Sequence, residues 1–87
     1  MNFLHTRVEI EDGDSIVVTL RGDEANVLVM SDTDFRNYRS GGRFSYHGGH
    51  YRRSPAIICP PESGAWNVVV DLGGDAGRVR ASVQVIH

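Results

Sequence analysis

Two stretches decide the fold of this 87-residue chain: Trp66-Asn67-Val68-Val69-Val70-Asp71-Leu72 and Val79-Arg80-Ala81-Ser82-Val83-Gln84-Val85. In both, apolar side chains recur at every second position, which is the period of a β-strand. Each predicted strand therefore has one face for the core and one that points outward. The glycine-rich residues 73–77 between them predict a tight hairpin or a short loop.

The same alternation continues toward the N-terminus. Residues 4–10 and residues 16–20 each place apolar side chains on one face, with an Asp-Gly pair between them that favours a turn. Residues 25–30 are apolar except Asn26, which predicts a strand buried on both faces. Residues 56–59 form a short apolar run between prolines, and prolines suit strand ends or an edge strand.

These segments predict an all-β fold. We expect a small antiparallel sandwich or partly open barrel of about seven or eight short strands. No window sustains the 3.6-residue period of a helix. At most one short helical turn is expected near residues 34–40, capped by Thr33 or Asp34 and ended by Gly41-Gly42. A chain of this length makes one domain, 1–87.

The single cysteine and the N-terminal residues bear on the cellular setting. Cys59 cannot form an internal disulfide, and its place in an apolar run predicts burial as a small hydrophobic side chain. The first residues lack the basic start and apolar run of a signal peptide, so a cytoplasmic location is expected. No apolar stretch approaches the roughly 20 residues that span a bilayer, so no membrane partner is expected.

Charge is segregated along the chain. Between Asp34 and Glu62 there is no acidic residue, and this window holds five of the nine basic residues and five of the seven aromatic residues. The formal charge of this window is +5. The rest of the chain carries −7, which gives the net charge of −2. Arginine forks and aromatic faces suit anions, sugars, nucleic acids and acidic proteins. The window therefore indicates a binding surface without identifying what it binds.

Within this window, residues 43–53 predict a β-hairpin. The central Gly48-Gly49 can supply both positive φ angles of a two-residue turn, which would place His47 opposite His50 and Tyr46 opposite Tyr51. The aromatic face should pack on the body, because an isolated two-stranded hairpin is not stable. The outward face then carries the candidate binding residues, which are Arg43, Ser45, His47, His50 and Arg52.

The favoured function is a non-enzymatic recognition module that binds an anionic ligand or an acidic protein partner through the hairpin 43–53. Single-stranded nucleic acid is an alternative ligand, because bases stack on aromatic side chains, but the sequence pI of about 6.0 argues against it. A small enzyme of unidentified reaction is the rival from another class. Self-association is also open, and the hairpin aromatics can serve packing alone.

No catalytic, metal-binding or cofactor-binding residues are predicted. His47 and His50 would face each other across the turn, as metal-binding histidines do. No third ligand is evident, and the flanking arginines would repel a divalent cation. Residues 73–77 lack the Lys-Ser/Thr of a phosphate-binding loop, so a turn is expected there.

The whole chain resembles a bacterial family known as domain of unknown function number eighteen-eighty-three. The residues that carry the resemblance are Met1-Asn2-Phe3-Leu4-His5, Gly13-Asp14, Asn26-Val27, Phe35 with Tyr38, Phe44 to Tyr46 with Gly48-Gly49, Pro55-Ala56, Gly64, Trp66-Asn67-Val68 and Asp71-Leu72-Gly73-Gly74. The resemblance implies a small β-domain that stands alone or is attached to TIR-type signalling domains, with a sensing or interaction role. It supplies no catalytic or binding residues. Ala25 and Ser54 depart from the cysteine and the aromatic residue expected at those positions.

Overall fold

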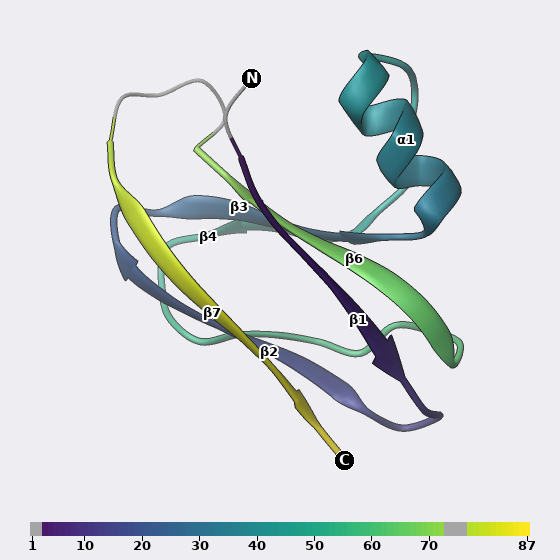
Figure 1. Cartoon of the computed structure of the whole chain (residues 1–87). Helices are drawn as coiled ribbons and strands as arrows, with labels where there is room; N and C mark the ends of the chain where they lie inside the picture. Colours follow the sequence, from purple (N-terminus) through teal and green to yellow (C-terminus); the bar gives the residue numbers. More distant parts are fainter. Residues whose placement is uncertain (1–2, 73–76) are drawn as a thin grey trace.

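The computed structural model describes residues 3–72 and 77–87, which contain seven strands and one helix (Figure 1). In chain order the elements are β1 (Phe3–Ile10), β2 (Ser15–Gly22), β3 (Ala25–Met30), α1 (Asp32–Ser40), β4 (His47–Tyr51), β5 (Ala56–Ile58), β6 (Gly64–Asp71) and β7 (Val79–Ile86).

The strands form two antiparallel sheets that pack face to face. Sheet A has the order β1-β6-β3-β4, and sheet B has the order β5-β2-β7. This arrangement confirms the predicted all-β sandwich. Because β6 belongs to sheet A and β7 to sheet B, they do not pair as a hairpin. The predicted loop at residues 73–77 lies mostly outside the described residues.

The main core fills the space between the two sheets. It is built from the inward side of the alternating pattern, with Ile16 and Val18 of β2 and Val27 and Val29 of β3 fully buried. Val68 of β6 completes the same layer, facing the core at 1% exposure. The predicted strand faces are therefore confirmed for these strands.

A second, smaller core lies on the other side of sheet A, where helix α1 packs (Figure 1). Phe35 and Tyr38 of α1 contact Leu28 and Met30 of β3 and Val69 of β6. The prediction that β3 is buried on both faces is confirmed. The outward face expected for β6 is instead covered by α1, so β6 is also buried on both faces.

Helix α1 is longer than the single turn expected from the sequence. It begins two residues earlier because Ser31, not Thr33 or Asp34, is the N-cap, and its side chain accepts the Asp34 backbone N–H. The helix ends where expected, at Gly41, whose φ of 81° and backbone bonds to Asn37 and Tyr38 form a left-handed cap.

The predicted hairpin at Gly48-Gly49 is wrong. His47 to Tyr51 form one continuous strand, β4, which pairs antiparallel with β3, from Val29 opposite His47 to Ala25 opposite Tyr51. The physical reason is that β3 is a buried strand with a free side, so pairing with it joins residues 47–51 to a four-stranded sheet. An isolated hairpin would gain much less.

The predicted burial of Cys59 is also wrong. Ala56 and Ile58 of β5 face the core, so the alternating positions Ile57 and Cys59 point to solvent, and the Cys59 thiol lies 3.2 Å from the Ser15 hydroxyl. Among the described residues, no helix has the length and hydrophobicity needed to cross a membrane.

Candidate interaction surface

The five candidate binding residues lie along one edge of sheet A, but they do not share one face. Arg43 and Ser45 are in the loop between α1 and β4, and Arg52 follows β4 directly. On β4 itself, His47 pairs with Val29, which faces the main core, whereas His50 pairs with Asn26 on the helix side. Residues 43–53 are called the basic edge below.

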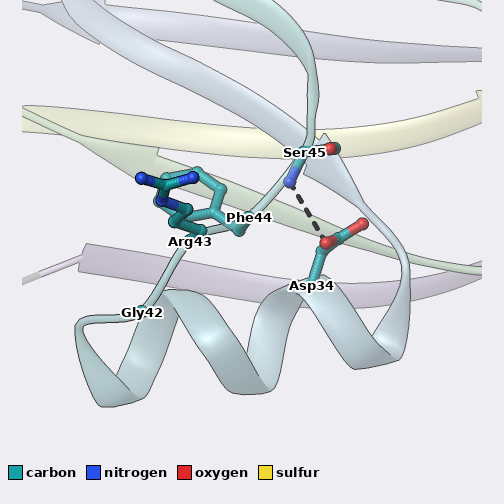
Figure 2. Close-up of a pocket in the computed structure, with 5 residues that line it drawn as sticks. All are labelled: Asp34, Gly42, Arg43, Phe44 and Ser45. Carbon is teal, nitrogen blue, oxygen red and sulfur yellow. Dashed lines mark hydrogen bonds between the residues drawn. The ribbon is translucent and has the colours of Figure 1, made fainter.

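The first part of the basic edge is tied to the start of α1. The Ser45 backbone N–H donates to one oxygen of Asp34 at 3.1 Å, and the Ser31 hydroxyl donates to the other at 3.0 Å. Figure 2 shows this contact, with Asp34 reaching from the helix toward the loop. Asp34, Gly42, Arg43, Phe44 and Ser45 line an open hollow at this point. Because both Asp34 oxygens accept hydrogen bonds, the carboxylate fixes the loop.

The aromatic side chains of the basic edge are buried to different extents. Phe44 is half-buried and meets the Tyr38 ring edge-on, with 5.0 Å between ring centroids. Tyr46 lies against Phe44 at 5.8 Å and is 49% exposed. Tyr51 is half-buried against the main core. The expected inward packing is therefore confirmed for Phe44 and Tyr51, and Tyr46 remains at the surface.

The two histidines of β4 have different neighbours. His47 meets the Trp66 ring edge-on, with 5.7 Å between centroids. The Nδ1 atom of His50 lies 3.0 Å from the side-chain oxygen of Asn26, and its Nε2 lies 3.3 Å from a carboxylate oxygen of Glu24. The histidines do not face each other, which removes the geometry that suggested a metal pair.

Glu24 also pairs with Arg52, whose Nε lies 3.4 Å from its second carboxylate oxygen. The Arg52 side chain is 80% exposed, so the ion pair is weak, worth roughly 0 to 1 kcal/mol. Glu24 and Asn26 orient His50 and Arg52. The sequence alone does not predict this role for Glu24 or Asn26. Only the pairing of β3 with β4 brings them together, and the strand alternation of β4 was not visible in a run with two glycines.

A chain of hydrogen bonds links the basic edge to the helix. Asn26 donates to one Asp71 oxygen at 2.9 Å, and the Tyr38 hydroxyl donates to the other at 2.6 Å. Burial, and then the hydrogen bond to Asp71, raise the pKa of Tyr38 above its ordinary value, so the hydroxyl stays a donor. The chain Tyr38–Asp71–Asn26–His50 therefore holds the His50 ring in place.

A second polar cluster anchors α1 to β1 and β6. The buried Asn67, 1% exposed, donates to Asp32 at 2.7 Å, and its oxygen lies 2.8 Å from His5 Nε2. Arg7 donates two hydrogen bonds, of 3.1 and 3.0 Å, to the carboxylate of the same Asp32. The bonds from Arg7 and then Asn67 lower the pKa of Asp32 to about 2. Asn67 of β6 thus bonds to His5 of β1, and Asp71 of β6 bonds to Asn26 of β3, so both side chains link neighbouring strands.

The arginines of the basic edge make a positive surface along the edge of sheet A. Within the described residues, Arg43 and Arg53 make no ion pair, and Arg52 shares the single carboxylate of Glu24 with His50. Positive charge continues onto α1, where Arg39 lies over the Phe35 ring at 5.7 Å. The described residues contain no cluster of three or more His, Cys, Asp or Glu side chains that could hold a metal ion.

The fold and this edge define a small all-β sandwich domain with one covering helix. The chain belongs to the family described as domain of unknown function DUF1883, whose model matches residues 1–87. No curated protein and no solved structure matches the chain.

Proposed function

We propose that this domain is a non-enzymatic recognition module that binds an acidic, extended protein segment by adding it as a strand beside β4. The proposal is carried by one observation: β4 is the edge strand of sheet A and lies in a segment with no acidic residue from 35 to 61. Arg43 precedes this strand, and Arg52 and Arg53 follow it.

The backbone of β4 supports strand addition. An edge strand leaves alternate N–H and C=O groups without a partner strand, and an incoming extended peptide can bond to them. Two of the five residues of β4 are glycines, which leaves little side-chain bulk in the way. A Cβ atom placed on Gly49 would meet no atom within 4 Å, so the face of the strand is open at this position.

The arginines around β4 select which segment can pair. Edge strands with positive charge discourage pairing with copies of themselves, and the same charge attracts a strand that carries carboxylates. Arg52 can exchange Glu24 for a carboxylate of the partner at little cost, because the exposed pair is worth roughly 0 to 1 kcal/mol. The arginine fork then binds that carboxylate with two hydrogen bonds.

An acidic peptide fits this edge better than a single-stranded nucleic acid does. Base stacking needs exposed aromatic rings, and Tyr46 is the exposed aromatic ring of the basic edge. Phe44 and Tyr51 are engaged in packing. One ring offers one stacking position, whereas a strand-binding edge needs backbone groups and charge, which β4 and its flanks supply.

The setting we propose is cytoplasmic signalling. The family resemblance implies modules that stand alone or are attached to TIR-type domains, and a domain that binds an acidic segment of another protein would serve as the interaction part of such an assembly. No catalytic group is assigned to the domain, and its action is binding alone.

The test is a fluorescence-anisotropy titration with a labelled eight-residue peptide in which glutamate alternates with threonine. A control peptide of equal charge carries two prolines in place of threonines, which blocks strand pairing. We expect the control peptide to bind at least about tenfold more weakly, because it keeps the charge and loses the main-chain bonds. Equal affinity for the two peptides would contradict strand addition.

Two protein variants distinguish an effect of the basic edge on peptide affinity from an effect of net charge. The double variant Arg43→Glu with Arg52→Glu should weaken the peptide at least about tenfold. The double variant Arg36→Glu with Arg78→Glu makes the same change in net charge outside the basic edge, and should leave the affinity within about twofold. A labelled oligothymidine is titrated at two salt concentrations in parallel. Tighter binding of the oligonucleotide than of the peptide, with a steep salt dependence, would overturn the proposal.

A further inference from the structure

We propose that the outer face of sheet B carries a binding site for a phosphate group, formed by Arg21 and Thr19 of β2 and by Arg80 and Ser82 of β7. These four residues are called the arginine row. The site lies on a different sheet from the basic edge and does not depend on the function proposed for it.

Strand pairing brings the four side chains together. Arg21 lies directly opposite Arg80, and Thr19 lies directly opposite Ser82. The pair between them, Leu20 and Ala81, packs against the main core. The arginine pair and the hydroxyl pair on either side of it therefore point to solvent. Opposite residues on antiparallel strands have Cβ atoms about 5 Å apart. The arginine pair and the hydroxyl pair are about 7 Å apart along the strands.

The surface is hollowed at this place. Thr19, Arg21, Arg80, Ala81 and Ser82 line a hollow of about 150 Å³. All of its polar side chains are exposed, so they are available to a ligand. The hollow is large enough for a phosphate group and too small for the whole of a larger ligand, whose remainder would lie in solvent.

The facing arginines have no counter-charge within the described part of the chain. Two like charges directly opposite each other destabilise a strand pair. Neither guanidinium makes an ion pair with a described carboxylate. Asp23 follows β2 closely, but one of its oxygens accepts the Arg78 backbone N–H at 2.7 Å. Glu24 is engaged by His50 and Arg52. None of the described carboxylates therefore pairs with either guanidinium, and an anion from solution can supply the missing charge.

The chemistry of the arginine row favours a tetrahedral oxyanion. Each guanidinium presents a planar fork of donors that fits two oxygens, and two such forks from adjacent strands can hold a phosphate between them. The Thr19 and Ser82 hydroxyls form no side-chain hydrogen bond with another described residue, and each can donate to a remaining oxygen. A phosphate offers these donors up to four oxygens in a tetrahedral arrangement, whereas a carboxylate offers two oxygens in one plane.

Protection of a sheet edge explains only part of this arrangement. A charged residue on an edge strand discourages pairing with other molecules, and Arg80 on β7 fits that role. Arg21 can share that role, because β2 pairs with β5 only at residues 16–18 and Arg21 lies beyond them. The facing hydroxyl pair has no part in edge protection. A phosphate site explains all four side chains together.

The first test is an amide-shift NMR titration with inorganic phosphate and with phenyl phosphate, at constant ionic strength and with chloride as the reference salt. We expect saturable shifts at residues 19–21 and 80–82. Tighter binding of phenyl phosphate would indicate an organic phosphate ligand, and equal or tighter binding of inorganic phosphate would indicate the free ion. Both results support the site, whereas shifts no larger than those caused by chloride would overturn it.

Variants localise the effect. Arg21→Gln and Arg80→Gln should each weaken phosphate binding at least about fivefold, because each removes one of the two forks. Arg36→Gln and Arg39→Gln remove the same charge on α1 and should leave the affinity within about twofold. Unchanged affinity in both Arg21→Gln and Arg80→Gln would contradict the proposal.

A thermal measurement supplies an independent readout. Without phosphate and at low salt, Arg80→Gln should melt at a higher temperature than the unaltered protein, because the repulsion between facing arginines is gone. Phosphate should raise the melting temperature of the unaltered protein more than that of Arg80→Gln, which binds phosphate more weakly. An equal rise in both proteins would show that phosphate acts elsewhere, and the proposal would fail.

Discussion

Single carboxylates organise much of this small domain, and Asp14 shows how. Its side chain is buried, accepts the Glu11 backbone N–H at 2.8 Å and lies 2.9 Å from Nδ1 of His87. The bond from Glu11, followed by that from His87, lowers the pKa of Asp14. The same contact with Asp14 raises the pKa of His87 above 6.5. One side chain thereby closes the turn after β1 and holds the end of β7.

The sign of the pH effect follows from these two shifts. Because the folded-state pKa of His87 is raised, its contribution to stability is complete below about 6.5 and is lost as the pH rises through the folded-state pKa. Because the pKa of Asp14 is lowered, its contribution is complete above about 3.8 and is lost as the pH falls through the folded-state pKa. The pair is therefore most stabilising between these limits.

We predict that an NMR titration of the His87 ring gives a pKa above 6.5, and that Asp14→Asn returns this pKa toward 6.5 because the carboxylate charge is removed. A His87 pKa that is the same in the two proteins would show that the contact does not form in solution.

At the scale of elements, β4 depends on a glycine that no other residue can replace. Gly48 has a φ of 119°, a conformation that L side chains rarely adopt, and a Cβ atom there would collide with the Val27 carbonyl oxygen. Gly49, the next residue along β4, has open space around it. The two glycines that suggested a hairpin turn therefore have different roles within one strand.

We predict that Gly48→Val lowers the free energy of unfolding by at least about 2 kcal/mol, since it adds backbone strain and a clash with β3. Gly49→Val is the matched control and should change stability by less than about 0.5 kcal/mol. Urea denaturation of the two variants measures both values. Equal losses at the two positions would contradict the assignment of residues 47–51 to a single strand.

The elements that the sequence predicted correctly are those with strict alternation or continuous apolar residues. In β2, Ile16 and Val18 mark the core face clearly, and β3 shows its burial on both faces. The start of α1 cannot be predicted from the sequence, because Ser31 precedes a run of polar residues with no apolar period. The exposure of Cys59 cannot be predicted either, because a short apolar run does not reveal where a strand of three residues ends.

The basic edge could be located from charge, but its geometry could not be predicted. Gly48-Gly49 suits a hairpin turn as well as an edge strand, and only the long-range pairing with β3 decides between them. That pairing separates His47 from His50 and brings Glu24 to Arg52. The arginine row was missed because it depends on which residues of β2 and β7 face each other, and an alternating pattern alone does not specify a register.

At the scale of the whole molecule, the two sheets present different surfaces. The outer face of sheet A is covered by α1, while the outer face of sheet B is open, with Ile57 59% exposed. The basic edge belongs to sheet A and the arginine row to sheet B. The two sites use separate residues, so charge changes in one should affect binding at the other only through weak, salt-screened fields.

The most direct test of recognition at β4 is an amide-shift and hydrogen-exchange NMR map with the glutamate–threonine peptide bound. Strand addition predicts that the largest shifts fall at residues 47–51 and that β4 amides facing away from β3 become protected from exchange. The proline-containing peptide should produce neither effect. Largest shifts on α1 or sheet B, with the exchange of β4 amides unchanged, would contradict the proposed mode of binding.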